Sequence, residues 1–81
     1  MPRYYFDTSN GDHHVRDDVG VELPGLEAAA NEAVMALPDL ARDALPDGDR
    51  RDFVASVRDE TGRVAFRATL SLAVEWLAPR P

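Results

Sequence analysis

The 81-residue chain contains no cysteine, lysine, isoleucine or glutamine, and aromatic residues make up only 7% of it. The absence of cysteine excludes disulfide bonds, thiolate metal ligands and cysteine nucleophiles. No apolar run approaches the roughly 20 residues that a membrane-spanning helix needs. The first residues form a strand pattern rather than a signal peptide, so we expect a soluble, cytoplasmic bacterial protein with no membrane contact.

The charge balance is acidic, with nine arginines against 15 acidic residues and a formal net charge of −6. This balance argues against nucleic acid and anionic membranes as partners, because both are bound through clustered cations. The exclusive use of arginine is compatible with anion recognition, but a GC-rich genome accounts for it more simply. With 44% hydrophobic residues and no linker-like stretch, residues 1–81 are expected to form a single domain.

The last third of the chain carries the clearest pattern, an apolar residue at every second position. Phe53, Ala55 and Val57 precede a turn at residues 60–62, and the alternation resumes after it. A period of two is typical of a half-buried β-strand, so this region predicts a hairpin with a long second strand. The apolar positions of that second strand are Val64, Phe66, Ala68, Leu70, Leu72, Val74 and Trp76.

The apolar positions also restrict how the two strands pair. If both strands turn their apolar residues to one face, a two-residue loop pairs Val57 with Phe66, and a four-residue loop pairs Val57 with Val64. A three-residue loop places one apolar set on the wrong face unless a β-bulge corrects it. The opposite face then carries Ser56, Arg58, Arg63, Arg67, Thr69 and Ser71.

Strands and turns are also predicted near the N-terminus. Residues 3–8 alternate as a first strand, with Tyr4 and Phe6 on one face. The Asn-Gly pair within residues 9–12 favours a tight turn. A weaker strand is expected at residues 14–16, followed by a second turn and a short extended piece near residues 21–23.

Between residues 26 and 45 the apolar spacing changes to three and four, which is typical of an amphipathic helix. Pro38 interrupts this pattern, because a proline inside a helix removes one backbone hydrogen bond. The helix either kinks there or breaks, with Pro38 beginning a second short helix, and we favour the break. The loop after the helix is expected at residues 46–49. The spaced apolar residues are Leu26, Ala30, Ala33, Val34, Leu37, Ala41, Ala44 and Leu45.

The expected order of elements is therefore strand, strand, helix, strand, strand (ββαββ). The most economical fold that buries both apolar patterns is of the α+β class. In it, a Pro-interrupted helix covers one face of an antiparallel-type sheet that ends in a long C-terminal strand.

The best candidate for an anion site is a basic strip on the uncovered sheet face, formed by Arg58, Arg63 and Arg67. The planar guanidinium group suits phosphate and carboxylate. Arg3 extends the strip if the first strand shares that face. Nearby acidic residues make cross-strand ion pairing on a solvated face the ordinary alternative.

Other side chains give little sign of chemistry. His13 and His14 lie among aspartates, but adjacent residues of an extended segment point to opposite faces, and their spacing does not match a metal site. The serines lack the setting of an activated nucleophile, and no glycine-rich phosphate loop is present. The sequence therefore predicts no catalytic residue, no metal, no cofactor and no enzymatic activity.

The long second strand indicates self-association. Residues 63–77 span about 50 Å when extended, whereas a compact domain of this length is roughly 30 Å across. The strand must bend, break or run past its own domain. Pairing with a second copy about a two-fold axis would cover its open edge, unless the segment curls back over the helix. The predicted dimer interface consists of Leu70, Leu72, Val74, Trp76 and Leu77.

Several short motifs resemble a known family. Residues 2–7 (PRYYFD), 17–23 (DDVGVEL) and 59–63 (DETGR) resemble a family of short bacterial domains of unknown function. That family is common in alphaproteobacteria and has an N-terminal Pro-Arg-Tyr-Phe-Phe-like signature. Residues 37–43 and 67–72 are similar to one branch of it. The resemblance covers nearly the whole chain and implies no catalytic residue, since the family has no established activity.

A looser resemblance, at the level of fold, is to the domain of HicB-type antitoxins. Residues 26–33 (LEAAANEA) resemble the Glu-Ala-rich helix of that domain, although no DNA-binding tail is evident. Three hypotheses follow, since fold alone does not establish function. We favour a homodimeric, non-enzymatic protein-interaction module. The alternatives are an antitoxin-like regulator with a basic protein partner, and a module that binds an anion or nucleic acid on the Arg58/Arg63/Arg67 face.

Overall fold

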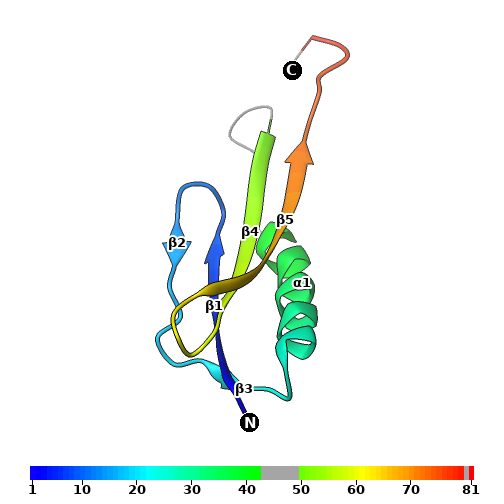
Figure 1. The fold of residues 1–81 in the computed structure, drawn as a ribbon. Helices are drawn as coiled ribbons and strands as arrows, with labels where there is room; N and C mark the ends of the chain where they lie inside the picture. Colours follow the sequence, from blue (N-terminus) through cyan, green and yellow to red (C-terminus); the bar gives the residue numbers. More distant parts are fainter. Residues whose placement is uncertain (43–49, 80) are drawn as a thin grey trace.

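The computed structural model of the protein describes residues 1–42, 50–79 and 81. Its elements are β1 (Arg3–Ser9), β2 (His14–Val15), β3 (Val21–Glu22), α1 (Leu26–Arg42), β4 (Arg50–Arg58) and β5 (Val64–Ala73). Within the described residues, one helix covers one face of a five-stranded antiparallel sheet (Figure 1). The strand order is β2-β1-β4-β5, and β3 pairs with the beginning of β1. The predicted α+β class and the strand–strand–helix–strand–strand order are confirmed, with one short strand added before the helix.

Strand β1 is central to the sheet and pairs with β2, β3 and β4. On its core side Tyr4 is buried and Phe6 is partly buried, as the alternation predicts. The turn that leads to β2 contains Gly11, with a positive φ of 99°. In the same turn the Asn10 side chain accepts a hydrogen bond from the backbone N–H of His13 at 2.9 Å. These contacts account for the predicted tight turn at residues 9–12.

Helix α1 packs on the sheet through two alanines and a leucine. Ala29, Ala33 and Leu37, spaced by four residues, are its buried positions. Beneath them Phe53 and Val57 of β4 are fully buried and form the centre of the core. Among the described residues, no helix combines the length and the apolar character needed to cross a lipid bilayer.

Helix α1 continues through Pro38, so the favoured break at this residue is wrong. The hydrogen bond lost at a proline is the one to the carbonyl four residues earlier, here Val34. Val34 is 49% exposed, so the lost hydrogen bond lies at an exposed position of the helix. Leu37 is buried and Leu40 packs against the core, so contacts on both sides of Pro38 hold the helix on the sheet. Residues 43–49, including the predicted helix end and loop, lie outside the described residues.

The hairpin of β4 and β5 has the register that places both apolar sets under α1. Val57 pairs with Phe66, as a two-residue loop would require. The next pair, Arg58 with Val64, is shifted by a β-bulge that leaves Ala65 without a partner on β4. The N–H of Asp59 then donates to the carbonyl of Arg63 at 2.9 Å, so the loop between these two residues consists of residues 60–62. Gly62 closes the loop with a φ of 88°, and its N–H donates to the carbonyl of Asp59 at 3.0 Å. The chain therefore adopts the three-residue loop with a correcting bulge.

Strand β5 ends earlier than the alternation suggests. Its last pair joins Ala73 to Arg50, the first residue of β4, so the predicted strand as far as residues 76–77 is too long. The chain then continues beyond Arg50, where β4 begins, and away from α1. It does not curl back over the helix (Figure 1). The molecule is consequently elongated, with extents of 54 × 20 × 18 Å and a radius of gyration of 15.1 Å. A compact domain of this length would have a radius of gyration of about 12 Å.

Candidate functional site

The face of the sheet opposite α1 carries most of the polar strand residues. Because side chains alternate along a strand, burial of Phe53 and Val57 under the helix turns their neighbours outward. Two of these outward residues, Ser56 and Arg58, are still only 9% exposed. The outward positions are Tyr5, Asp7 and Ser9 of β1, Val54, Ser56 and Arg58 of β4, and Arg67, Thr69 and Ser71 of β5.

Arg58 is held by Asp7 on the neighbouring strand β1. Its Nε donates to Asp7 Oδ2 at 2.6 Å, and its Nη2 donates to Asp7 Oδ1 at 3.1 Å. Nη2 also donates to the Asp17 carbonyl at 2.7 Å, and the guanidinium carbon lies 5.1 Å from the centre of the Tyr5 ring. The two hydrogen bonds lower the pKa of Asp7 and raise the pKa of Arg58 from their ordinary values. Arg58 is therefore engaged within the protein.

Asp17 ties the segment between β2 and β3 to β1. Its carboxylate accepts hydrogen bonds from the backbone N–H of Phe6 at 3.1 Å and of Val19 and Gly20 at 3.0 Å. Its own backbone N–H donates to Asp7 Oδ1 at 2.9 Å. Burial raises the pKa of Asp17, but the backbone donors outweigh burial and leave the pKa below its ordinary value. This network positions the segment that follows β2.

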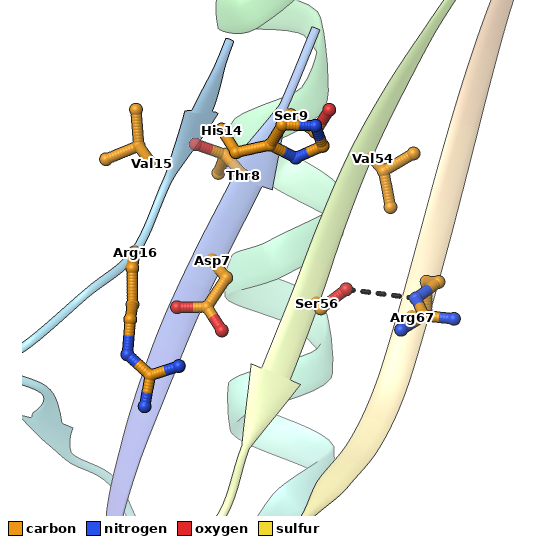
Figure 2. A pocket seen from close by; sticks show the side chains of 9 residues that line it. All are labelled: Asp7, Thr8, Ser9, His14, Val15, Arg16, Val54, Ser56 and Arg67. Carbon is orange, nitrogen blue, oxygen red and sulfur yellow. Dashed lines mark hydrogen bonds between the residues drawn. The ribbon is translucent and has the colours of Figure 1, made fainter. Parts of the chain in front are cut away.

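An open groove of about 510 Å³ lies on the outer face of the sheet (Figure 2). Arg16 stands on the β2 side, Arg67 on the β5 side, and Asp7 lies between them (Figure 2). Arg67 Nε donates to Ser56 Oγ at 3.1 Å, whereas Arg16 Nε is 3.7 Å from an oxygen of the exposed Asp18. Two guanidinium groups thus face a cavity of small-ligand size. The groove is lined by Asp7, Thr8, Ser9, His14, Val15, Arg16, Val54, Ser56 and Arg67.

The three arginines of the predicted basic strip lie in different surroundings. Arg58 is bound to a carboxylate of β1, and Arg63 lies beside the hairpin loop with its Nε 3.3 Å from Asp59 Oδ2. Of the three, Arg67 lines the groove, where Arg16 joins it from the other side. Sequence reasoning missed Arg16, because the weak strand expected at residues 14–16 gave no sign of where it would lie in the sheet.

The two histidines also separate. His14 pairs with Ser9 in the β1–β2 ladder and lines the groove. His13 lies in the preceding turn, where its carbonyl accepts a hydrogen bond from the backbone N–H of Asn10 at 3.1 Å. In residues 1–42, 50–79 and 81, no group of three His, Asp or Glu side chains is arranged to hold a metal ion.

A second candidate surface is the free edge of β5 together with the segment after it, here named the C-terminal edge (residues 68–77). Within the described part of the chain, β5 pairs with β4 on one side and with no strand on the other. Leu72 and Val74 are half-buried, while Leu70, Trp76 and Leu77 are 38%, 58% and 90% exposed. The residues of the predicted dimer interface therefore follow one continuous path, and large apolar side chains exposed along such a path are typical of contact surfaces.

Comparisons with known proteins identify the family to which this chain belongs. Searches of curated proteins and of solved structures found no match. A family model described as a domain of unknown function matches residues 3–71, which run from the first residue of β1 into β5. The match covers most of the chain, and it confirms the predicted resemblance to a domain-of-unknown-function family. The chain therefore belongs to the family of the domain of unknown function DUF6894.

Proposed function

We propose that this domain is a non-enzymatic protein-interaction module that forms a homodimer through the C-terminal edge. The observation that carries the proposal is the edge of β5 that no strand covers among the described residues, together with the segment after it, which continues beyond the sheet with exposed apolar side chains. An edge strand presents unpaired backbone N–H and C=O groups, and a second strand satisfies them.

The composition of the edge supports pairing with another strand. Natural proteins protect exposed edges with lysine, proline, inward-pointing charges or bulges. Between Arg67 and Glu75 the chain carries no charge and no proline. The bulge at Ala65 lies before this stretch and leaves it regular. Residues 68–74 are thus an edge without these protective features.

A second copy of the chain is the partner that suits this edge. A two-fold dimer uses the same patch on both chains, so each exposed apolar residue of the patch is covered in both copies. Full burial of a large apolar side chain contributes about 1.5–3 kcal/mol. The main favourable contribution to the free energy of dimerisation is therefore the burial of Leu70, Trp76 and Leu77 in both chains. The loss of entropy on association opposes it.

Light scattering on the wild type and on a chain truncated after Ser71 tests this proposal. We expect the wild type at micromolar concentration to have twice the 8.9 kDa mass of the chain, and the truncated chain to be monomeric. The truncation keeps every residue of the family match, and circular dichroism checks that it is folded. A monomeric wild type would contradict the proposal, and a dimeric truncated chain would place the interface elsewhere.

A second candidate function is binding of a small anion in the outer groove. The observation that favours it is the pair of guanidinium groups, Arg16 and Arg67, on opposite sides of a cavity of about 510 Å³. The carboxylate between them, Asp7, is already neutralised by Arg58. Phosphate and carboxylate are the groups that such a pair recognises.

Titration with inorganic phosphate, followed by amide chemical shifts at low salt, tests this second function. We expect shifts at groove residues that Arg16→Gln abolishes. Arg42→Gln is the matched control, because Arg42 is an exposed arginine of α1 on the other side of the sheet. The absence of any shift with phosphate, or binding that survives Arg16→Gln, would exclude the groove as the site.

A further inference from the structure

The free edge of β5 also restricts how a second copy can pair with it. This inference rests on the dimer proposed above and specifies its register. When two identical strands pair antiparallel around a two-fold axis, the sheet continues smoothly only if residues of the same face stand opposite one another. Because side chains alternate, one residue must then lie on the axis, opposite its own copy.

We propose that Ser71 lies on this axis. Arg67 of each copy then faces Glu75 of the other copy on the outer side of the sheet. On the α1 side, Phe66 of each copy faces Trp76 of the other. The two-fold axis repeats both contacts, so two ion pairs and two aromatic pairs flank the central serines, and cross-strand pairs of both kinds stabilise sheets.

The positions of these side chains in the monomer suit the contacts. Arg67 is exposed on the outer face, and Trp76 is 58% exposed beyond the end of β5. Phe66 packs against the core while staying partly accessible, so Trp76 of a second copy would extend that core. Strand β5 ends at Ala73, opposite Arg50, where β4 begins. Among the described residues no strand pairs with residues 74–76, and a second β5 would supply them with a neighbour.

Other registers leave the charges unmatched. A shift of the axis by one residue in either direction places Arg67 opposite an alanine or a leucine, and Glu75 opposite an alanine or a threonine. A shift to Thr69 places Glu75 opposite Arg63. However, Arg63 lies beside the hairpin loop, before the bulge, and already contacts an acidic neighbour at 3.3 Å. The proposed register is therefore the one that joins opposite charges within the regular part of β5.

The position of the axis also keeps the two domains apart. Ser71 lies close to the end of β5, and this end reaches beyond the last turn of α1 (Figure 1). Rotation about an axis at this point directs the two domains away from each other. The paired segment is then limited to residues 66–76 of each chain, and the two helices do not compete for space.

Charge reversal tests the register through the dissociation constant of the dimer. We expect Arg67→Glu and Glu75→Arg each to weaken dimerisation about 10- to 100-fold, because two ion pairs become two like-charge pairs. The double reversal should restore the wild-type constant within about threefold. Analytical ultracentrifugation of a dilution series at low ionic strength, where charges are least screened, measures each constant. The matched control is Arg63→Glu, an exposed arginine that the register leaves outside the interface.

The outcomes separate the register from the dimer itself. A monomeric wild type overturns both. A wild-type dimer that Arg67→Glu leaves unchanged overturns the register while the proposed dimer stands. Sensitivity to Arg63→Glu instead of Arg67→Glu overturns the axis at Ser71 and moves it to Thr69.

Cysteine cross-linking gives a readout that does not depend on affinity. The chain has no native cysteine, so Ser71→Cys introduces a single thiol. Two copies on the axis bring their Cα atoms within the roughly 4.4–6.8 Å that a disulfide bridges. Thr69→Cys is the matched control on the same face, because its two copies lie about 13 Å apart along the strands in this register. We expect rapid oxidation to a covalent dimer for Ser71→Cys alone, and faster oxidation of Thr69→Cys would contradict the proposal.

Discussion

Replacement of Asp7 by asparagine keeps the size of the side chain and removes the charge that holds Arg58. Asp7 accepts two hydrogen bonds from Arg58 and one from the backbone N–H of Asp17. The amide oxygen of asparagine can retain part of this set, but its NH₂ group turns a donor toward other donors. Arg58 then keeps the Asp17 carbonyl at 2.7 Å but loses the opposite charge. The outer-face network is weakened at its centre.

The size of the effect follows from these contacts. Hydrogen bonds to charged groups contribute about 1.5–3 kcal/mol each, and solvent exposure reduces that contribution. The Asp7 side chain is 26% exposed. Since part of the bonding survives, we expect Asp7→Asn to lower the free energy of unfolding at pH 7 by about 2 kcal/mol. For a domain of this length, that corresponds to a fall in the thermal midpoint of about 8–16 °C.

The same substitution changes the dependence of stability on pH. Arg58 holds the pKa of Asp7 below its ordinary value of 3.8. The charged carboxylate therefore stabilises the folded state above that ordinary value, and this stabilisation is lost as the pH falls through the lower pKa of the folded state. The difference in stability between wild type and Asp7→Asn should be complete at pH 7 and shrink in acid.

Urea and thermal unfolding, followed by circular dichroism at one protein concentration, measure this difference across the pH range. Asp18→Asn is the matched control, because Asp18 is 84% exposed and lies 3.7 Å from Arg16, so its loss should barely move the midpoint. An Asp7→Asn protein as stable as the wild type at pH 7 would refute the reasoning. So would a difference that persists unchanged in acid.

Three further substitutions test local features of the fold. Gly20→Ala should lower the free energy of unfolding by about 2 kcal/mol or more, because φ is positive and the added Cβ would meet side-chain carbons of Arg3 and Tyr5 at 2.9 Å. Gly11→Ala, also at positive φ but with nothing within 4 Å, should cost only about 1 kcal/mol, and equal losses in urea unfolding would argue against the close approach. Pro38→Ala should stabilise the protein by about 1–3 kcal/mol in the same assay, because α1 regains a backbone hydrogen bond. A lower midpoint would contradict this reasoning.

Local patterns were enough to predict the layers of the fold. A period of two in the sequence placed Phe53 and Val57 on the core face, and both are fully buried. The change to helical spacing after residue 26 predicted α1, and the Asn-Gly pair predicted the turn after β1. These features are predictable because the direction of a side chain depends on its position within its own element.

Local reasoning failed where packing from elsewhere in the chain decides the outcome. Pro38 lowers the helical propensity of its own segment, yet contacts of Leu37 and Leu40 with the sheet hold α1 together across it. The alternation of apolar residues was compatible with hairpin loops of two or four residues, and with a three-residue loop if a β-bulge was present. A β-bulge that allows a three-residue loop while both apolar sets share one face was one of these alternatives. The structure has this bulge, at Ala65.

The sequence by itself determined which faces are apolar, the α+β class and the order of the main elements. Only the tertiary structure decided which arginines are engaged and which line the groove. Arg58 is bound to a carboxylate 51 residues earlier, while Arg16 reaches the groove from β2 to stand across from Arg67. The physical reason is that periodicity reports on neighbours along one element, whereas an ion pair or a groove depends on strand order. Strand order brings together residues that no local pattern connects.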